Sequence, residues 1–179
     1  TYSLLSTSED EEVARDFILF GRPDVTVIVV DASRLQRNFS LVLQILEISS
    51  KAVLCLNLMD EARRHQIEID VRTLSKDLGI PVIATSARTK EGLSDLLAAI
   101  HQVADGSFKP AKTTSFQLAK QTGAAVAAIA KRLHMLDNNL SNVNWLAMRL
   151  IEEDKNIINA LQKGQLSPSI NSENLSPLL

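Results

Sequence analysis

Three apolar runs lie in the first half of the chain, and each of them ends on a polar residue. The runs are Val25–Val30, Val53–Leu56 and Pro81–Ala84, and they are followed by Asp31, Asn57 and Thr85. A run without polar alternation is typical of a strand that is covered on both faces, as in a parallel sheet between helices. We therefore expect one parallel sheet whose strands end at a common edge.

In the segments before and between these runs, apolar residues recur at the spacing of a helix. A capping-box pattern, Ser8 with Glu11, opens the first helix, and Gly21 ends it. The apolar stripe of this helix consists of Val13, Phe17 and Phe20. A second pattern covers residues 34–50, where apolar side chains recur densely enough for a helix that packs on a sheet. Strands alternating with helices in this way predict an α/β layer structure.

Two later helices carry clear start and stop residues. Asp70 is the expected N-cap of a helix over Val71–Leu78, and Gly79 is its expected terminator. Gly92 precedes the most regular helical pattern of the chain. The apolar positions of that pattern are Leu93, Leu96, Leu97, Ile100 and Val103. These helices complete the layers on the predicted sheet.

The composition changes after residue 105, where the strand-like runs stop and helical patterns continue. The expected parts are an α/β domain over residues 1–105, a linker over 106–113, a helical domain over 114–164 and a disordered tail over 165–179. The linker and the tail are assigned because both are rich in the residue types that favour turns and loops.

Composition and charge narrow the class of protein. Hydrophobic residues make up 45% of the 179 residues and aromatic residues 4%, which supports an aliphatic core. The formal net charge of −2 gives no electrostatic reason for binding nucleic acid or an anionic lipid surface. No apolar stretch reaches the roughly 20 residues of a membrane span, and no signal peptide is recognisable. We expect the chain itself to be soluble.

Several side chains that could carry chemistry have simpler explanations. Cys55 lies inside the central apolar run and is expected to be a buried thiol. His65, His101 and His134 are far apart and lack the spacing of a metal site, so we expect surface positions and no metal ligands. Trp145 is expected to pack between helices.

Polar side chains follow the central run at the edge where the strands end. Asn57 comes directly after the run, and Asp60 lies three residues later. A carboxylate at this edge can accept two hydrogen bonds side by side, which matches the N1–H and 2-amino group of guanine. Adenine has an acceptor at N1 and no 2-amino group, so it would leave a buried charge unpaired at a cost of roughly 2–4 kcal/mol.

This Asn-x-x-Asp pair is a weak motif by itself, and its context strengthens it. Ser86 and Ala87 follow the next apolar run, so the sheet topology would bring them to the same edge. Asp31 and Ser33 also lie at this edge, where we expect a helix-capping role for them rather than contact with a ligand.

The order and spacing of several motifs resemble one known family. The motifs are Val30–Ser33, Leu56–Ala62, Ser86–Arg88, Gly92–Leu93 and Trp145–Glu152. Together they resemble the cytosolic amino-terminal region of ferrous iron transport protein B, a bacterial iron transporter linked to a GTPase. The resemblance spans roughly residues 1–154. It implies a partial Ras-like G domain, with a parallel sheet flanked by helices, followed by a small helical domain.

The resemblance also implies a guanine nucleotide site. Its residues would be Asn57, Leu58, Met59, Asp60, Ser86, Ala87 and Arg88. Asn57 would tie neighbouring loops together and contact the base, the Ala87 N–H would reach guanine O6, and the stem of Arg88 would lie over the ring. Leu58 stands where most small GTPases have a Lys, as is usual for this family. The second switch region would include Thr1, Tyr2, Ser3 and Leu4.

The phosphate-binding motif of a GTPase is not found in these residues. No Gly in the chain is followed by Lys-Ser or Lys-Thr, which the Gly-x-x-x-x-Gly-Lys-Ser/Thr loop requires. The resemblance implies GTP or GDP as the ligand and Mg²⁺ as a cofactor, with the Mg²⁺ ligands expected upstream of Thr1. We therefore expect no catalytic residue in this chain and no GTPase activity from the chain alone.

Two functions remain open at this point. The first is the GTP-binding region of a ferrous iron transporter at the cytoplasmic face of the bacterial inner membrane, in which the helical domain relays the nucleotide state to the membrane pore. The second is a degenerate, non-catalytic interaction module with a G-domain fold. A GTPase of the ribosome-assembly type is disfavoured by Leu58 and by a helical part in place of a basic RNA-binding domain.

The expected partners follow from the first of these functions. They are a guanine nucleotide and the transmembrane part of the same transporter, and no nucleic acid is expected. In the Ras-like strand order, the strand before the phosphate loop lies beside Val25–Asp31. Without that neighbour, Val25–Asp31 would be an open apolar edge. We therefore expect the chain to self-associate through this strand.

Overall fold

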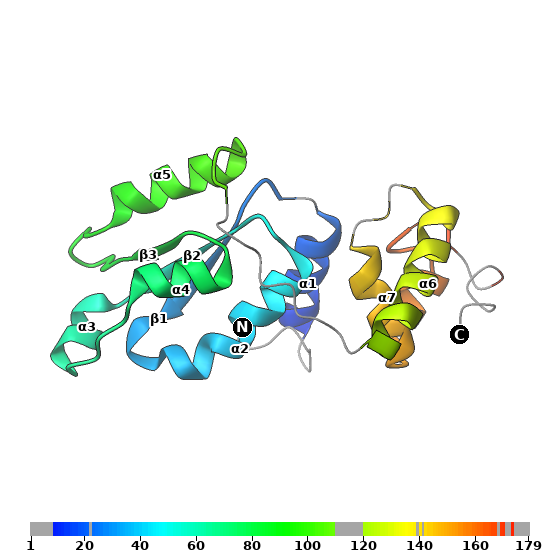
Figure 1. The fold of residues 1–179 in the computed structure, drawn as a ribbon, viewed down its shortest axis with the longest axis horizontal. Coiled ribbons are helices and arrows are strands. Elements are labelled where there is room, and N and C mark those ends of the chain that lie inside the picture. The colour runs from blue at the N-terminus through cyan, green and yellow to red at the C-terminus, as the bar shows by residue number, and fades with distance from the viewer. Residues whose placement is uncertain are drawn as a thin grey trace. The chain divides into compact units, whose positions relative to one another are not determined.

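The structure is a computed structural model that describes residues 9–21, 23–109, 120–138, 140, 142–167, 169–170 and 173. Contacts within the chain divide it into two compact units, residues 1–115 and 116–179. The first unit contains α1 (Glu9–Phe20), β1 (Thr26–Asp31), the short 3-10 helix η1 (Ala32–Arg34), α2 (Leu35–Ile48), β2 (Ala52–Asn57), α3 (Met59–Arg64), α4 (Val71–Leu78), β3 (Val82–Ala84) and α5 (Leu93–Ala104) (Figure 1). The second unit contains α6 (Lys120–Leu136), α7 (Val143–Ile151) and α8 (Lys155–Gln162).

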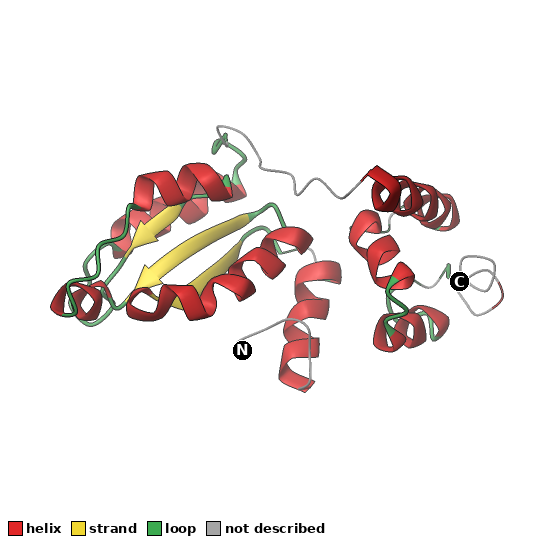
Figure 2. Cartoon of the chain, turned by 60° about the horizontal axis from the view of Figure 1, so that its bottom comes forward, coloured by secondary structure: helices red, strands yellow, loops and turns green. Residues whose placement is uncertain are grey.

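Strand β2 is the centre of a three-stranded parallel sheet with the order β1-β2-β3. Thr26 lies beside Ala52 and Asp31 beside Asn57, so β1 and β2 pair along their whole length. Every residue of β2 before Asn57 is buried. The arrowheads in Figure 2 all point to the same edge of the sheet. The expected parallel sheet, built on a central strand that is buried on both faces, is confirmed.

Helices cover the two faces of the sheet, as Figure 2 shows. On one face, Val53 of β2 packs with Ala99 and Val103 of α5. Side chains alternate between the faces along a strand, so Ile28 and Val30 of β1 point to the opposite face, where α2 packs and both are buried. Burial of each such aliphatic side chain contributes roughly 1.5–3 kcal/mol, which makes these two layers the core of the unit.

Strand β1 is an edge strand of the described sheet and is well covered on one face only. Val27 is 37% exposed and Val29 is 60% exposed. The register places them beside Val53 and Cys55, on the face where α5 packs against β2 and β3. The expectation that every apolar run is covered on both faces is therefore wrong for β1. Leu97 of α5 belongs to the predicted apolar pattern, but it is 68% exposed because α5 meets the sheet through other positions.

Carboxylates fix the starts of two helices. Asp31 Oδ1 accepts hydrogen bonds from the N–H and the hydroxyl of Ser33, at 2.8 and 2.6 Å, which confirms its helix-capping role. Asp70 caps α4 by accepting a bond from the N–H of Thr73 at 2.9 Å. Gly79 ends α4 in the left-handed conformation, with φ of 71°. Both ends of α4 thus follow the sequence prediction.

Helix α1 differs from the prediction in its buried face. Val13 is 69% exposed and Phe17 is 63% exposed, whereas Leu19 and Arg15 are buried. The helix carries apolar residues on more than one side. Spacing identifies an apolar stripe but does not determine which side of the helix meets the core, so the predicted buried face is wrong. Ser8, the expected cap of α1, lies outside the described residues.

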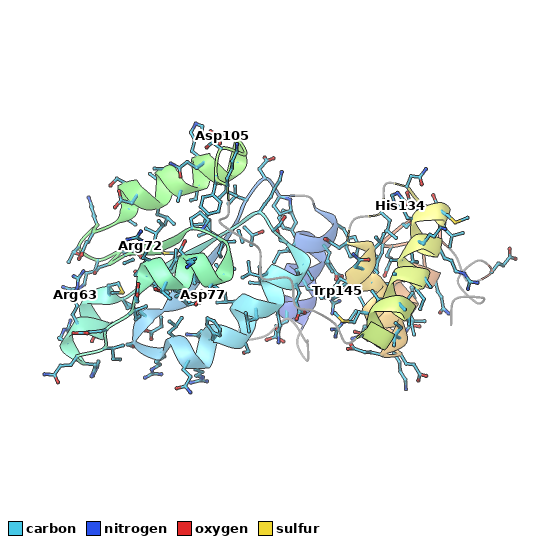
Figure 3. All side chains as sticks on the ribbon, in the orientation of Figure 1. Arg63, Arg72, Asp77, Asp105, His134 and Trp145 are labelled. Atoms are coloured by element: carbon cyan, nitrogen blue, oxygen red, sulfur yellow. The ribbon has the colours of Figure 1, made fainter. Side chains whose placement is uncertain are left out.

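The second unit packs around side chains that are fully shielded from solvent. They are Leu133, Leu146, Ile157 and Leu161. Trp145 on α7, labelled in Figure 3, is 8% exposed, and the Arg149 guanidinium lies 5.5 Å from the centre of its ring, as expected of a packing residue. Ser167 and Ile170 are buried, and the Ser167 hydroxyl donates to Asp137 Oδ2 at 2.6 Å. This part of the segment expected to be a disordered tail is packed.

Gly92 and Gly106 offer a matched test of how α5 is joined to the sheet. Both have φ of +74°, but a Cβ at Gly92 would clash with the Ala84 carbonyl oxygen, whereas a Cβ at Gly106 would meet nothing within 4 Å. We expect Gly106→Ala to lower the free energy of unfolding by about 1 kcal/mol through backbone strain alone. Gly92→Ala should cost more than about 2 kcal/mol, because backbone must also shift. Urea unfolding measures both, and equal losses would contradict the steric assignment.

Candidate functional site

The loops that follow β2 and β3 meet at the edge where the strands end. Asn57 is the last residue of β2, and Leu58 turns the chain with a left-handed φ of 61° into α3. Asp60 therefore lies in the first turn of α3. On the other side, β3 runs into Thr85 and Ser86, which are both buried. The parallel pairing of β2 with β3 is what brings the two loops together.

Asn57 links the two loops through its side-chain oxygen. Asn57 Oδ1 accepts a hydrogen bond from the Ala87 N–H at 3.1 Å and one from the Thr85 hydroxyl at 3.4 Å. The backbone adds a third link, because the Met59 N–H donates to the Thr85 carbonyl at 3.1 Å. Thr85 Oγ1 also lies 3.2 Å from the buried Cys55 sulfur. These bonds hold the loops at a fixed separation.

Asp60 has one oxygen in an ion pair and one oxygen without a partner. Asp60 Oδ2 accepts a hydrogen bond from Arg88 Nη2 at 2.8 Å. Asp60 Oδ1 is buried and has no hydrogen-bond partner of good geometry, and the same holds for the hydroxyl oxygen of Ser86. The hydrogen bond from Arg88, together with the nearby Ser86 hydroxyl, lowers the pKa of Asp60 from 3.8 to about 2. The carboxylate is therefore ionised at neutral pH.

A second ion pair joins α3 to the loop after β3. Both terminal nitrogens of Arg63 donate to Glu91, at 2.9 and 2.5 Å. The hydrogen bond from Arg63 lowers the pKa of Glu91. Figure 3 shows Arg63 on α3. The loop is closed on itself by the Ser86 N–H, which donates to the Glu91 carbonyl at 3.1 Å.

The structure places the expected site residues unequally. Asn57, Asp60, Ser86, Ala87 and Arg88 come together in the contacts described above. Met59 is 8% exposed, so its side chain belongs to the core, while Leu58 is 39% exposed beside it. The expected switch residues Thr1, Tyr2, Ser3 and Leu4 lie outside the described residues.

Sequence reasoning missed three contributors to this edge. They are Thr85, which joins the loops, and the ion pair between Arg63 and Glu91. Thr85 could have been found, because it directly follows an apolar run at the same edge as Ser86. No spacing signal could have found the ion pair, since its members are separated by 28 positions.

The described part of the chain also bears on metal binding and on membrane insertion. Those residues contain no group of three or more His, Cys, Asp or Glu side chains that could hold a metal ion. No helix among them is long and apolar enough to cross a membrane. His101 is exposed and lies 3.1 Å from Asp105, and His65 and His134 are also exposed.

The lowered pKa of Asp60 has a consequence for stability at acid pH. Because folding lowers this pKa, the ionised Asp60 stabilises the fold above the ordinary value of 3.8, and that contribution is lost as the pH falls through about 2. In Arg88→Gln we expect Asp60 to titrate closer to 3.8 by carboxyl NMR. Lys90→Gln, which removes a charge from the same loop, should leave the titration unchanged. An Asp60 pKa that is the same with and without Arg88 would contradict the ion pair.

Comparison with known proteins gives a consistent family. The family model described as ferrous iron transport protein B matches residues 1–100. The Fe(2+) transporter FeoB of Salmonella choleraesuis is 34% identical over 158 residues, which cover 86% of this chain and 20% of that protein. The chain thus spans about a fifth of the length of this relative.

Solved structures with the same fold come from the same family. The cytosolic domain of the T. maritima FeoB iron transporter in a GDP form matches with a TM-score of 0.77 and 31% identity, over 89% of this chain and 62% of that chain. The mGMPPNP-bound NFeoB from S. thermophilus matches with a TM-score of 0.75 and 26% identity, over 99% of this chain and 62% of that chain. The sheet and helices of the first unit are those of a Ras-like G domain. Since the family model covers more than half of its residues, this chain belongs to the FeoB family of ferrous iron transport proteins.

Proposed function

We propose that this chain is the base-reading part of the GTP-binding region of a ferrous iron transporter. The observation that carries the proposal is a pair of neighbouring buried polar atoms, Asp60 Oδ1 and Ser86 Oγ, which have no hydrogen-bond partner of good geometry apart from each other. A buried polar atom without a hydrogen bond costs roughly 1–3 kcal/mol, and a bound ligand with suitable donors recovers that cost. FeoB relatives solved in GDP and GMPPNP forms support a guanine nucleotide as this ligand.

The proposed contacts follow the functional groups of guanine. The Asp60 carboxylate accepts from N1–H and from the 2-amino group. The Ala87 N–H reaches O6, and Asn57 contacts the base while it holds the two loops together. Leu58 offers an apolar surface beside the ring. Adenine presents an acceptor where Asp60 needs a donor, so this arrangement discriminates between the two purines.

Phosphate chemistry is assigned to residues outside this chain. The Gly-x-x-x-x-Gly-Lys-Ser/Thr loop that cradles phosphates and helps to hold Mg²⁺ does not occur in the sequence, and the described residues present no carboxylate cluster for a metal. We infer that the 179 residues alone do not hydrolyse GTP, and that Mg²⁺ is bound by other parts of the intact protein.

In the intact transporter, we propose that this region works at the cytoplasmic face of the membrane. The nucleotide state would act on the switch region at residues 1–20, and the helical unit would pass it to the transmembrane part. The FeoB relatives solved as cytosolic domains support this location. The second candidate, a non-catalytic interaction module, is favoured only by the missing phosphate motif.

Replacing the Asp60 carboxylate by a carboxamide should change the preferred base. In Asp60→Asn, one oxygen becomes an N–H donor, which suits the 2-carbonyl of xanthine and opposes the 2-amino group of guanine. We expect NMR-monitored titrations of the chain to show GDP bound more tightly than ADP. The Asn variant should lose this preference, weaken GDP binding by at least about ten-fold and gain binding of xanthosine diphosphate.

Asp70→Asn is the control for this exchange, because Asp70 caps α4 outside the site. It should keep the GDP preference. Equal binding of GDP and ADP by the unaltered chain would rule out base reading by Asp60. Phosphate release from GTP by the chain alone would rule out the inferred lack of hydrolysis. In the intact transporter, ferrous iron uptake by the Asn variant should depend on XTP instead of GTP.

We also propose that the isolated chain self-associates through β1. This strand is the edge of the described sheet, and Val27 and Val29 present apolar surface beside unpaired backbone groups. A second copy that pairs with this edge would satisfy the backbone and cover both valines.

Val29→Lys should block this association, because a charge on an edge strand opposes pairing. We expect sedimentation of the unaltered chain to show a dimer that grows with concentration, and the Lys variant to remain a monomer. Met135→Lys, at a residue of the second unit that is 74% exposed, is the matched control and should not change the association. If the unaltered chain stays monomeric at high concentration, the proposed pairing through β1 is excluded.

A further inference from the structure

Both oxygens of Asp60 are unavailable to a base in this structure. The reachable oxygen, Oδ2, accepts a hydrogen bond from Arg88 Nη2 at 2.8 Å, and Arg64 Nη2 is 3.9 Å away from the same oxygen. The other oxygen, Oδ1, makes no hydrogen bond but is buried. Oδ2 is therefore occupied by Arg88, and a ligand can bond to Oδ1 only after side chains around Asp60 have moved.

Recognition of guanine by a carboxylate uses both oxygens at once. The N1–H and the 2-amino group lie on one edge of the ring and each requires an acceptor. A guanidinium carries N–H donors of the same kind, and Arg88 uses one of them, Nη2, to bond to Oδ2. Arg88 and the edge of guanine are thus chemically similar ligands that compete for Asp60.

We propose that Arg88 is a displaceable ligand of Asp60, which occupies the base-reading carboxylate in the absence of nucleotide and leaves it when guanine binds. This inference rests on the proposed base-reading function and adds a specificity-determining role for Arg88. Its side chain is 71% exposed, so it can swing into solvent without disturbing the core. The side chain of Asp60 is less exposed, at 18%.

The loops do not need Arg88 to stay together. Asn57 Oδ1 bonds the Ala87 N–H, the Met59 N–H bonds the Thr85 carbonyl, and Arg63 bonds Glu91. These links join the same two loops and none of them involves Asp60 or Arg88. A role for Arg88 as a structural tie would be redundant, whereas no other side chain donates a hydrogen bond to Asp60 Oδ2 in the described residues.

The size of the effect follows from the exposure of the pair. Exposed ion pairs shift an equilibrium by a factor of about 1.5 to 5, and they weaken as salt rises. The cost of displacing Arg88 should therefore lower the affinity for guanine by no more than about five-fold, compared with a chain that lacks this ion pair. Arg88 therefore does not block the site, but it affects the affinity for the base and the rate at which the base binds.

Titrations of GDP and ADP into the full 179-residue chain test the proposal. At low salt, Arg88→Gln should bind GDP about two- to five-fold more tightly than the unaltered chain, with no change for ADP. Arg88→Lys keeps a cation beside Asp60, so its affinity for GDP should be close to that of the unaltered chain and lower than that of Arg88→Gln. Lys90→Gln removes a charge from the same loop but not from Asp60, and it is the matched control. At high salt the difference between Arg88→Gln and the unaltered chain should disappear, because screening releases the ion pair.

The outcomes separate this inference from the function on which it rests. A chain that prefers GDP, with equal or weaker GDP binding in Arg88→Gln, overturns displacement and leaves base reading intact. That result would favour a stacking role for the Arg88 stem. No preference for GDP in either protein overturns both ideas.

Discussion

The structure depends on the burial of β2 between two strands and two layers of helices. Because Leu54 and Leu56 face one layer and Val53 and Cys55 face the other, β2 cannot shift its register by one residue without exposing its core side chains. This constraint fixes where the strand ends, and so where Asn57 stands. Pairing with β3 then fixes Thr85 opposite that end, with its N–H on the Leu56 carbonyl at 2.8 Å. The geometry of the two loops therefore follows from the packing of β2 and from its pairing with β3.

The candidate site combines rigid and adjustable parts. Backbone bonds and the Asn57 side chain hold the two loops close together, and Thr85, which takes part in two of these bonds, is buried. The charged side chains are different, because Arg88 and both members of the pair between Arg63 and Glu91 are largely exposed. Exposed ion pairs contribute little to stability, and they can be remade at small cost. The fold therefore places the carboxylate firmly and leaves the cation around it free to rearrange.

Local signals in the sequence were sufficient for much of this architecture. Asp70 and Gly79 mark the ends of α4 because capping depends on the few residues around a helix end, and Asn57 marks the end of β2 because an apolar run must stop at solvent. What failed depends on distant neighbours. Val29 is exposed because α5 packs on β2 and β3 on that face, which the sequence around Val29 does not encode. The pairing of Asp60 with Arg88 joins residues 28 positions apart, and no periodicity encodes such a contact.

The strands of the described sheet stand side by side in the order in which the chain presents them. Each strand and its following helix can therefore be added to the structure that precedes it, without insertion between strands already paired. As the chain leaves the ribosome, β2 can pair with the edge of β1, and β3 can then pair with the edge of β2. Each pairing joins strands that are neighbours in the sequence. Synthesis and sheet growth can proceed in the same direction, and the edge that carries the candidate site is complete once the third strand and the loop after it have formed.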